Sequence, residues 1–187
     1  MKNKSLLLTI VALVILASLA ILSGLYKWEA EAVVVAFMGF TFIVYWDRRK
    51  EKQYRNQESR RVARTMLGEI TFNLKIVAQN KRIRDSRSDT VPVKYHDASW
   101  RALSSGGHLL VLPDDLVEKL SNLYRSVLDS NRFVERIEEL AVGVGQALTS
   151  AAYNTQAFRT WVFDRLDGYE DGMIEIKAAL TDFLRGL

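Results

Sequence analysis

The chain has 187 residues, a length typical of one domain or of one domain with an additional anchor. The formal net charge is +4, and residues 47–65 alone contribute +5, because eight lysines and arginines there outnumber three acids. Cysteine is absent, which excludes disulfides, thiolate metal sites and a cysteine nucleophile.

Two apolar stretches at the start of the chain predict a transmembrane hairpin over residues 1–46. Residues 5–26 form 22 positions without a charge, enough for a helix to cross a hydrocarbon core of ~30 Å. The second predicted span, residues 30–46, includes an uncharged run of only 15 positions, so Glu31 has to lie at the membrane edge. A cleavable signal peptide is the alternative interpretation of the first stretch.

The distribution of lysine and arginine predicts the orientation of this hairpin. Two lysines precede the first stretch, one lies in the turn, and eight basic residues follow the second stretch. Since basic residues concentrate in cytoplasmic flanks, both termini are expected in the cytoplasm and the protein is expected to be integral to the cell (inner) membrane.

Several such hairpins around one axis would make a small cation channel. Glu29 and Glu31, in and after the turn, are the candidates for the pore mouth, because an acidic ring attracts cations. Ser5, Thr9 and Ala12 are the candidates for the pore lining. Neither stretch contains an internal ionisable group, which disfavours an ion-coupled transporter, and so apolar a pore would tend to dewet.

Residues 47–65 predict a basic stalk helix that continues the second span without a proline. Its cations either bind anionic lipid headgroups or only set the topology and solvate the stalk. Nucleic acid is not an expected ligand, because no set of base-stacking aromatic residues accompanies the charges. The lipid-binding candidates are Arg48, Arg49, Lys50, Lys52 and Arg55.

Residues 66–187 predict a cytoplasmic helical bundle interrupted by a basic loop at 81–96, so the fold class is all-α. Glu69 and Asn73, four residues apart, are expected to share a hydrogen bond at the surface or the edge of the domain. The first apolar face is spaced 4, 3, 4, 3 and consists of Ala63, Leu67, Ile70, Leu74 and Val77.

The middle of the chain contains a short helix between clear boundary signals. Asp97 is the expected N-cap of a helix over 98–105, and Gly106 and Gly107 end it. The apolar residues 109–112 are expected to form a buried connector.

Pro113 and two following acids then open a long helix. Residues 141–152 are small and glycine-bearing, which indicates either a closely packed helix or a break between two helices. After a turn at Asp167–Gly168 the last helix repeats apolar residues at 3, 4, 3, 4, as in a bundle or coiled coil, and such seams also suit self-association. These residues are Met173, Ile176, Leu180, Phe183 and Leu187.

No catalytic, cofactor or metal signature is present, so no enzyme activity, cofactor or metal is expected. Glycine-rich phosphate loops and nucleophile elbows are absent from the sequence. The two histidines, His96 and His108, are expected to flank helices rather than bind metal. The acids of residues 164–175 fail the calcium-loop pattern. They are expected either to cap the last helix and face solvent or to pair with basic residues of the stalk or loop, and weak binding of a cation is a further alternative.

Three sequence stretches carry a resemblance to known proteins. "LGEITFNL", "SWRALSSGGHLLVLP" and "LYRSVLDSN", within residues 65–131, resemble uncharacterised prokaryotic membrane proteins that join a short transmembrane anchor to a cytosolic helical domain. This resemblance implies an architecture and no activity.

The sequence therefore predicts a homo-oligomeric integral membrane protein. Its cytoplasmic bundle would act as an interaction or sensing module for a cytosolic protein partner. The alternative is the small oligomeric cation channel, with the bundle as its gate.

Overall fold

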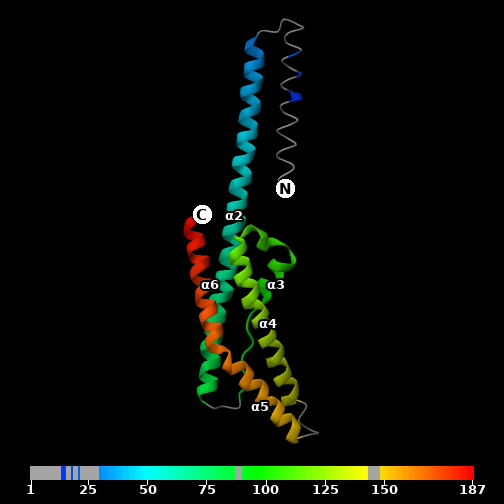
Figure 1. The fold of residues 1–187 in the computed structure, drawn as a ribbon, viewed down its shortest axis with the longest axis vertical. Coiled ribbons are helices and arrows are strands. Elements are labelled where there is room, and N and C mark those ends of the chain that lie inside the picture. Colours follow the sequence, from blue (N-terminus) through cyan, green and yellow to red (C-terminus); the bar gives the residue numbers. More distant parts are fainter. Residues whose placement is uncertain (1–13, 16–17, 19–20, 22–29, 87–89, 143–147) are drawn as a thin grey trace. The chain divides into compact units, whose positions relative to one another are not determined.

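The computed structural model describes residues 14, 15, 18, 21, 30–86, 90–142 and 148–187, and every regular element among them is a helix. The all-α fold class is therefore confirmed. The chain divides into two compact units, Met1–Arg55 and Asn56–Leu187, and we call the second unit the bundle. The elements are α2 (Ala30–Asp85), α3 (Ala98–Ser105), the 3-10 helix η1 (His108–Val111), α4 (Asp114–Val142), α5 (Leu148–Asp164) and α6 (Leu166–Gly186) (Figure 1).

Helix α2 is continuous over 56 residues. Its sequence contains no proline, so no backbone donor is lost and no ring disrupts the helical hydrogen bonds. The prediction that the second apolar stretch, the basic stretch and the first bundle helix form one helix is confirmed. The helix ends at Asp85, so residues 81–85 of the predicted loop are helical instead.

The predicted transmembrane hairpin is not supported. Among the described residues, no helix combines the length and the apolar character that membrane crossing requires. The uncharged run in α2, residues 32–46, is about 22 Å long as a helix, shorter than a hydrocarbon core of ~30 Å. This finding contradicts the predicted integral membrane protein, its localisation with both termini in the cytoplasm, and the channel.

The residues on which the hairpin and pore predictions depended are largely outside the described part of the chain. Residues 5–26, the first predicted span, are described only at positions 14, 15, 18 and 21. Of the pore-mouth candidates, Glu29 is outside the described residues, and Glu31 is described only as backbone within α2. The pore-lining candidates Ser5, Thr9 and Ala12 are outside as well.

Three helices contribute most of the core of the bundle. Residues 56–85 of α2 lie beside α4 and α6, while α5 crosses at an angle (Figure 1). Met66 from α2, Tyr124 from α4 and Met173 from α6 are all completely buried in one apolar cluster. On α6 the buried positions recur at 3, 4, 3 and 4 residues, so one face of the helix packs inward. These positions are Leu166, Tyr169, Met173, Ile176 and Leu180.

Between α2 and α3 the chain forms an irregular segment, residues 90–97, that we call the strap; it runs along the bundle as an extended trace (Figure 1). Side chains from α2 hold its backbone. Asn80 accepts a hydrogen bond from Val93 N at 2.7 Å and donates one to the Val93 carbonyl oxygen at 2.9 Å. Asn73 does the same with His96, at 2.7 and 2.8 Å.

A third asparagine holds the strap from the other side. Asn131 on α4 accepts a hydrogen bond from Tyr95 N at 2.8 Å and donates one to the Tyr95 carbonyl oxygen at 2.9 Å. Each amide side chain thus offers one acceptor and one donor to a single residue, as a neighbouring strand would. Because a buried backbone needs such partners, the three asparagines allow a segment without regular structure to lie against the core.

Helix α3 has the boundaries that the sequence predicted, and the 3-10 helix η1 forms where the sequence predicted only a buried connector, residues 109–112. Gly107, between the two elements, has φ +68°, a left-handed conformation that favours glycine. Leu109 and Leu112 are buried, as expected of the connector, but Leu110 between them is 80% exposed. In a 3-10 helix residues three apart share a face, so Leu109 and Leu112 point inward together and Leu110 does not.

The last two helices differ from prediction at their junction. Helix α5 ends at Asp164 and α6 begins at Leu166, so Asp167 and Gly168 lie in the first turn of α6 and not in a turn before it. Further upstream, α4 ends at Val142 and α5 begins at Leu148. The structure therefore has two helices around the glycine-bearing stretch, and residues 143–147 lie outside the described part.

Candidate functional site

The first turn of α3 is fixed by a buried carboxylate. Glu69 on α2 is only 8% exposed, although the sequence predicted it at the surface or domain edge. Its oxygens accept hydrogen bonds from Ser99 N at 2.6 Å, Trp100 N at 3.3 Å and the Tyr124 hydroxyl at 2.6 Å. A negative charge is favourable here because the first amides of a helix have no partner within it.

This arrangement corrects two predictions made from the sequence. Asp97 occupies the N-cap position but makes no side-chain capping bond; its carboxylate accepts a hydrogen bond from Arg101 at 2.7 Å. Glu69 and Asn73 do not form their expected surface hydrogen bond, because Asn73 is 1% exposed and binds the strap. The acceptor that caps α3 is instead Glu69 on α2, which precedes Ser99 by 30 residues in the sequence.

Tyr124 connects this carboxylate to the aromatic ring of Trp100. Burial and the nearby negative charge of Glu69 raise the pKa of Tyr124 above its usual range, so the phenol remains a hydrogen-bond donor. The Trp100 ring stacks on the Tyr124 ring with centroids 4.8 Å apart and planes 6° apart. Trp100 is therefore held both at its backbone and at its ring.

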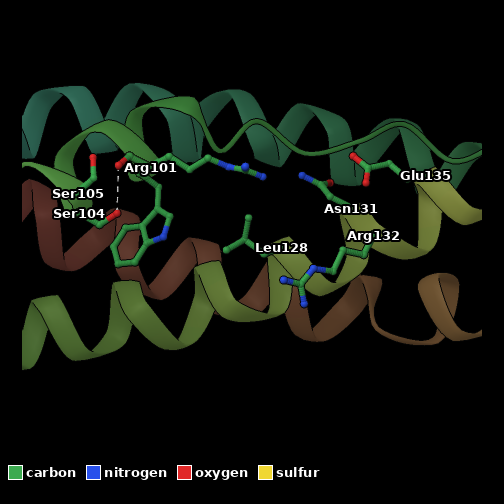
Figure 2. A pocket seen from close by; sticks show the side chains of 8 residues that line it. Arg101, Ser104, Ser105, Leu128, Asn131, Arg132 and Glu135 are labelled. Atoms are coloured by element: carbon green, nitrogen blue, oxygen red, sulfur yellow. Dashed lines mark hydrogen bonds between the residues drawn. The ribbon is translucent and has the colours of Figure 1, made fainter.

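A cleft of about 590 Å³ opens beside Trp100, between α3 and α4 (Figure 2). This volume is in the usual range of small-molecule sites. The lining residues are Trp100, Arg101, Ser104 and Ser105 from α3, and Leu128, Asn131, Arg132 and Glu135 from α4.

Two guanidinium groups and one carboxylate line the cleft. Arg101 pairs with Asp97 at 2.7 Å, and Arg132 contacts Asp129 at 3.4 Å. Glu135 is the acid of the lining, with Lys94 3.8 Å away. Because a guanidinium has five donors, one surface carboxylate leaves donors on each arginine for another anion.

The five lipid-binding candidates of the sequence lie within eight consecutive residues of α2. Arg48, Arg49, Lys50, Lys52 and Arg55 are all exposed. The ammonium group of Lys50 lies 5.7 Å from the centroid of the Trp46 ring. Residues 47–55, which we call the basic segment, contain five cations and two acids.

Apolar side chains precede the basic segment on the same helix, and they are exposed as well. Phe42 is 63% and Tyr45 62% exposed. Val35, Met38, Phe42 and Tyr45 follow one another at 3, 4 and 3 residues, and Arg49 and Lys52 continue the same stripe at 4 and 3.

The acids near the start of α6 pair with basic residues, one of the alternatives that the sequence left open. Lys81, at the end of α2, contacts both Asp167, at 2.6 Å, and Glu170. Arg84 approaches Asp167 at 3.5 Å. The bonded ammonium of Lys81 lowers the pKa of Asp167, so this acid holds its charge as a partner of α2.

The two histidines have unrelated surroundings. His108 Nδ1 is 3.1 Å from a carboxylate oxygen of Glu58, and His96 packs its ring edge-on against Phe72 with centroids 4.4 Å apart. Among the described residues, no group of three or more histidines and acids could hold a metal ion.

Comparisons with known protein families, with curated proteins and with solved structures found no match for this chain. The likeness to prokaryotic membrane proteins seen in residues 65–131 therefore has no support from them.

Proposed function

We propose that this protein is a non-enzymatic binding module that attaches to an anionic lipid surface through residues 34–55 of α2. The observation that supports the proposal is the exposed apolar stripe of α2 and its continuation, in the same register, into Arg49 and Lys52. The attachment is to the headgroup layer and requires no helix to cross the bilayer.

The apolar residues support a lipid surface because they leave large side chains in water. Exposed apolar groups that lie together mark an interaction surface, since transfer of such groups out of water is favourable. Val35 and Met38 are 69% and 65% exposed, and two aromatic residues, Tyr45 and Trp46, stand where the apolar residues give way to cations. Aromatic rings of this kind prefer the boundary between hydrocarbon and headgroups.

The basic segment supports an anionic rather than a neutral surface. Each lysine or arginine near an anionic leaflet contributes about 1 kcal/mol of attraction, and the attraction falls with salt. Five exposed cations outnumber the two acids of the segment, so the net attraction is favourable.

The proposal is tested by co-sedimentation of the full chain with vesicles of phosphatidylcholine, with and without about a third of phosphatidylserine. We expect binding to the anionic vesicles and its loss at 0.5 M salt. The triple variant Arg48→Gln, Arg49→Gln, Lys52→Gln should bind about a hundredfold more weakly, because three cations are removed. The variant Phe42→Ser should weaken binding as well.

A matched control removes three exposed cations from the bundle: Arg136→Gln, Lys177→Gln and Arg185→Gln. It changes the net charge equally and should leave vesicle binding within twofold of the original protein. Equal losses in both triple variants would refute a site on α2. Binding to duplex DNA in preference to anionic vesicles would assign the basic segment to nucleic acid and reject the proposal.

A further inference from the structure

We propose that the cleft between α3 and α4 binds a small organic oxyanion, a carboxylate or phosphate carried on a flat apolar frame. The guanidinium groups of Arg101 and Arg132 would bind the oxyanion, and Trp100 and Leu128 would contact the frame. This site belongs to the bundle and does not depend on lipid attachment by α2.

The two arginines suit an oxyanion because of where they lie. They come from different helices, Arg101 from α3 and Arg132 from α4, and both line the same cleft. Figure 2 shows the Arg101 side chain extending along the cleft toward Asn131, with Leu128 and Arg132 on the α4 side. Planar guanidinium donors match the oxygens of carboxylate and phosphate and bind them through paired hydrogen bonds.

Asn131 adds a fixed polar group to the cleft. It is 7% exposed, and its amide is oriented by two hydrogen bonds to the Tyr95 backbone. The amide nitrogen has two hydrogens, of which the Tyr95 carbonyl takes one, so the second remains for a ligand. A donor held by the strap in this way needs no rearrangement on binding.

The apolar part of the ligand follows from Trp100 and Leu128. Trp100 is half-buried and stacked on Tyr124, so its ring is a rigid wall of the cleft. Aromatic and apolar walls with a few polar groups are typical of small-molecule sites. Asp97 and Asp129 each leave donors on the arginine that they contact, and these remaining guanidinium donors favour a ligand of negative charge.

The experiment measures binding of four naphthalene probes to the full chain by isothermal titration calorimetry. The 2-naphthoate and 2-naphthyl phosphate anions separate the two sources of oxyanion. The neutral 2-naphthamide and the cationic 2-naphthylmethylamine keep the frame and change the charge. We expect at least one anion to bind tenfold or more tightly than the amide, and the amine to bind more weakly than the amide.

Two variants locate the effect. Arg101→Gln with Arg132→Gln should reduce the affinity for the preferred anion at least tenfold and leave the amide affinity within twofold. Arg136→Gln with Arg185→Gln, which removes equal charge outside the cleft, should change neither. The charge-preserving pair Arg101→Lys with Arg132→Lys should still prefer the anion over the amide.

Three results would overturn the proposal. These are equal affinity of the original protein for anion and amide, tighter binding of the amine, and unchanged anion affinity in the Arg101→Gln, Arg132→Gln variant. If the glutamine pair proves poorly folded by circular dichroism, the lysine pair decides: loss of its preference for the anion, in a protein with the original melting temperature, also rejects the site.

Discussion

Replacement of Glu69 by glutamine keeps the shape of the side chain and removes one acceptor and the negative charge. In the structure the carboxylate has three donors: Ser99 N, Trp100 N and the Tyr124 hydroxyl. Glutamine can accept from one side only, and its amide hydrogens face the other donors. The tyrosine hydroxyl can turn to accept, but one backbone N–H of α3 is left without an acceptor. We therefore expect Glu69→Gln to destabilise the protein.

The magnitude follows from these contacts. An unpaired buried donor costs about 1–3 kcal/mol, and bonds to a charged acceptor are stronger than neutral ones. We expect Glu69→Gln to lower the free energy of unfolding by about 2 kcal/mol, measured by urea denaturation with circular dichroism at 222 nm. Tyr124→Phe removes one donor and leaves both amides bound, so it should cost about 1 kcal/mol.

The double variant Glu69→Gln, Tyr124→Phe measures the coupling between the two side chains. Because they share a hydrogen bond, the two single losses should not add. Substitution of a surface residue usually changes the free energy of unfolding by about 0.5 kcal/mol or less. A loss of that size for Glu69→Gln would refute the reasoning that this carboxylate holds α3.

Three more predictions follow from the bundle. Three tyrosines have their pKa raised chiefly by burial, and they are Tyr95, Tyr124 and Tyr169. Unfolding lets these phenols ionise, so stability should fall as pH rises above about 10, and absorbance at 295 nm should show them ionising only with unfolding. In hydrogen exchange, the Tyr95 amide should be protected. The variant Asn131→Ala should lower the protection of the Tyr95 amide more than it lowers the protection of the amides of α4. Leu109→Ala should cost about 2–4 kcal/mol in urea denaturation, while Leu110→Ala should cost less than about 0.5 kcal/mol.

Periodicity predicted the helices of the bundle well but described their inward faces incompletely. On α2 the predicted apolar positions Ala63, Ile70 and Val77 are buried. Met66 and Asn73 are equally buried and were not part of the predicted stripe. A helix packed on two sides, against α4 and α6 and under the strap, buries a wider face than one apolar stripe reveals.

The polar contacts of the candidate site could not be predicted from the sequence. Asparagine and glutamate within a helix usually face solvent, so Asn73 and Glu69 were assigned to the surface or domain edge. Their partners lie 23 and 30 residues away, in a strap and a short helix whose positions depend on the whole bundle. The available signal was polar residues at core spacing: Asn73 and Asn80 stand seven apart on α2.

The predictions about the membrane failed for a different reason. They counted uncharged positions on both sides of the turn, and the second run, residues 32–46, was already short of a full span. Within this run, Val35, Met38 and Phe42 are exposed large apolar side chains in the structure. Their exposure supports a binding surface, which the sequence anticipated only through the neighbouring cations.

The hydrogen bonds that hold the strap are made to its backbone, and this determines which residues can occupy it. The hydrogen bonds from the three asparagines to residues 93, 95 and 96 are made to peptide groups, so these bonds do not depend on which side chains those residues carry. Proline is excluded at those three positions, because each donates its N–H. Position 92, which donates to none of the asparagines, is occupied by proline. Homologous chains should therefore avoid proline at 93, 95 and 96 and retain the asparagines on the helices.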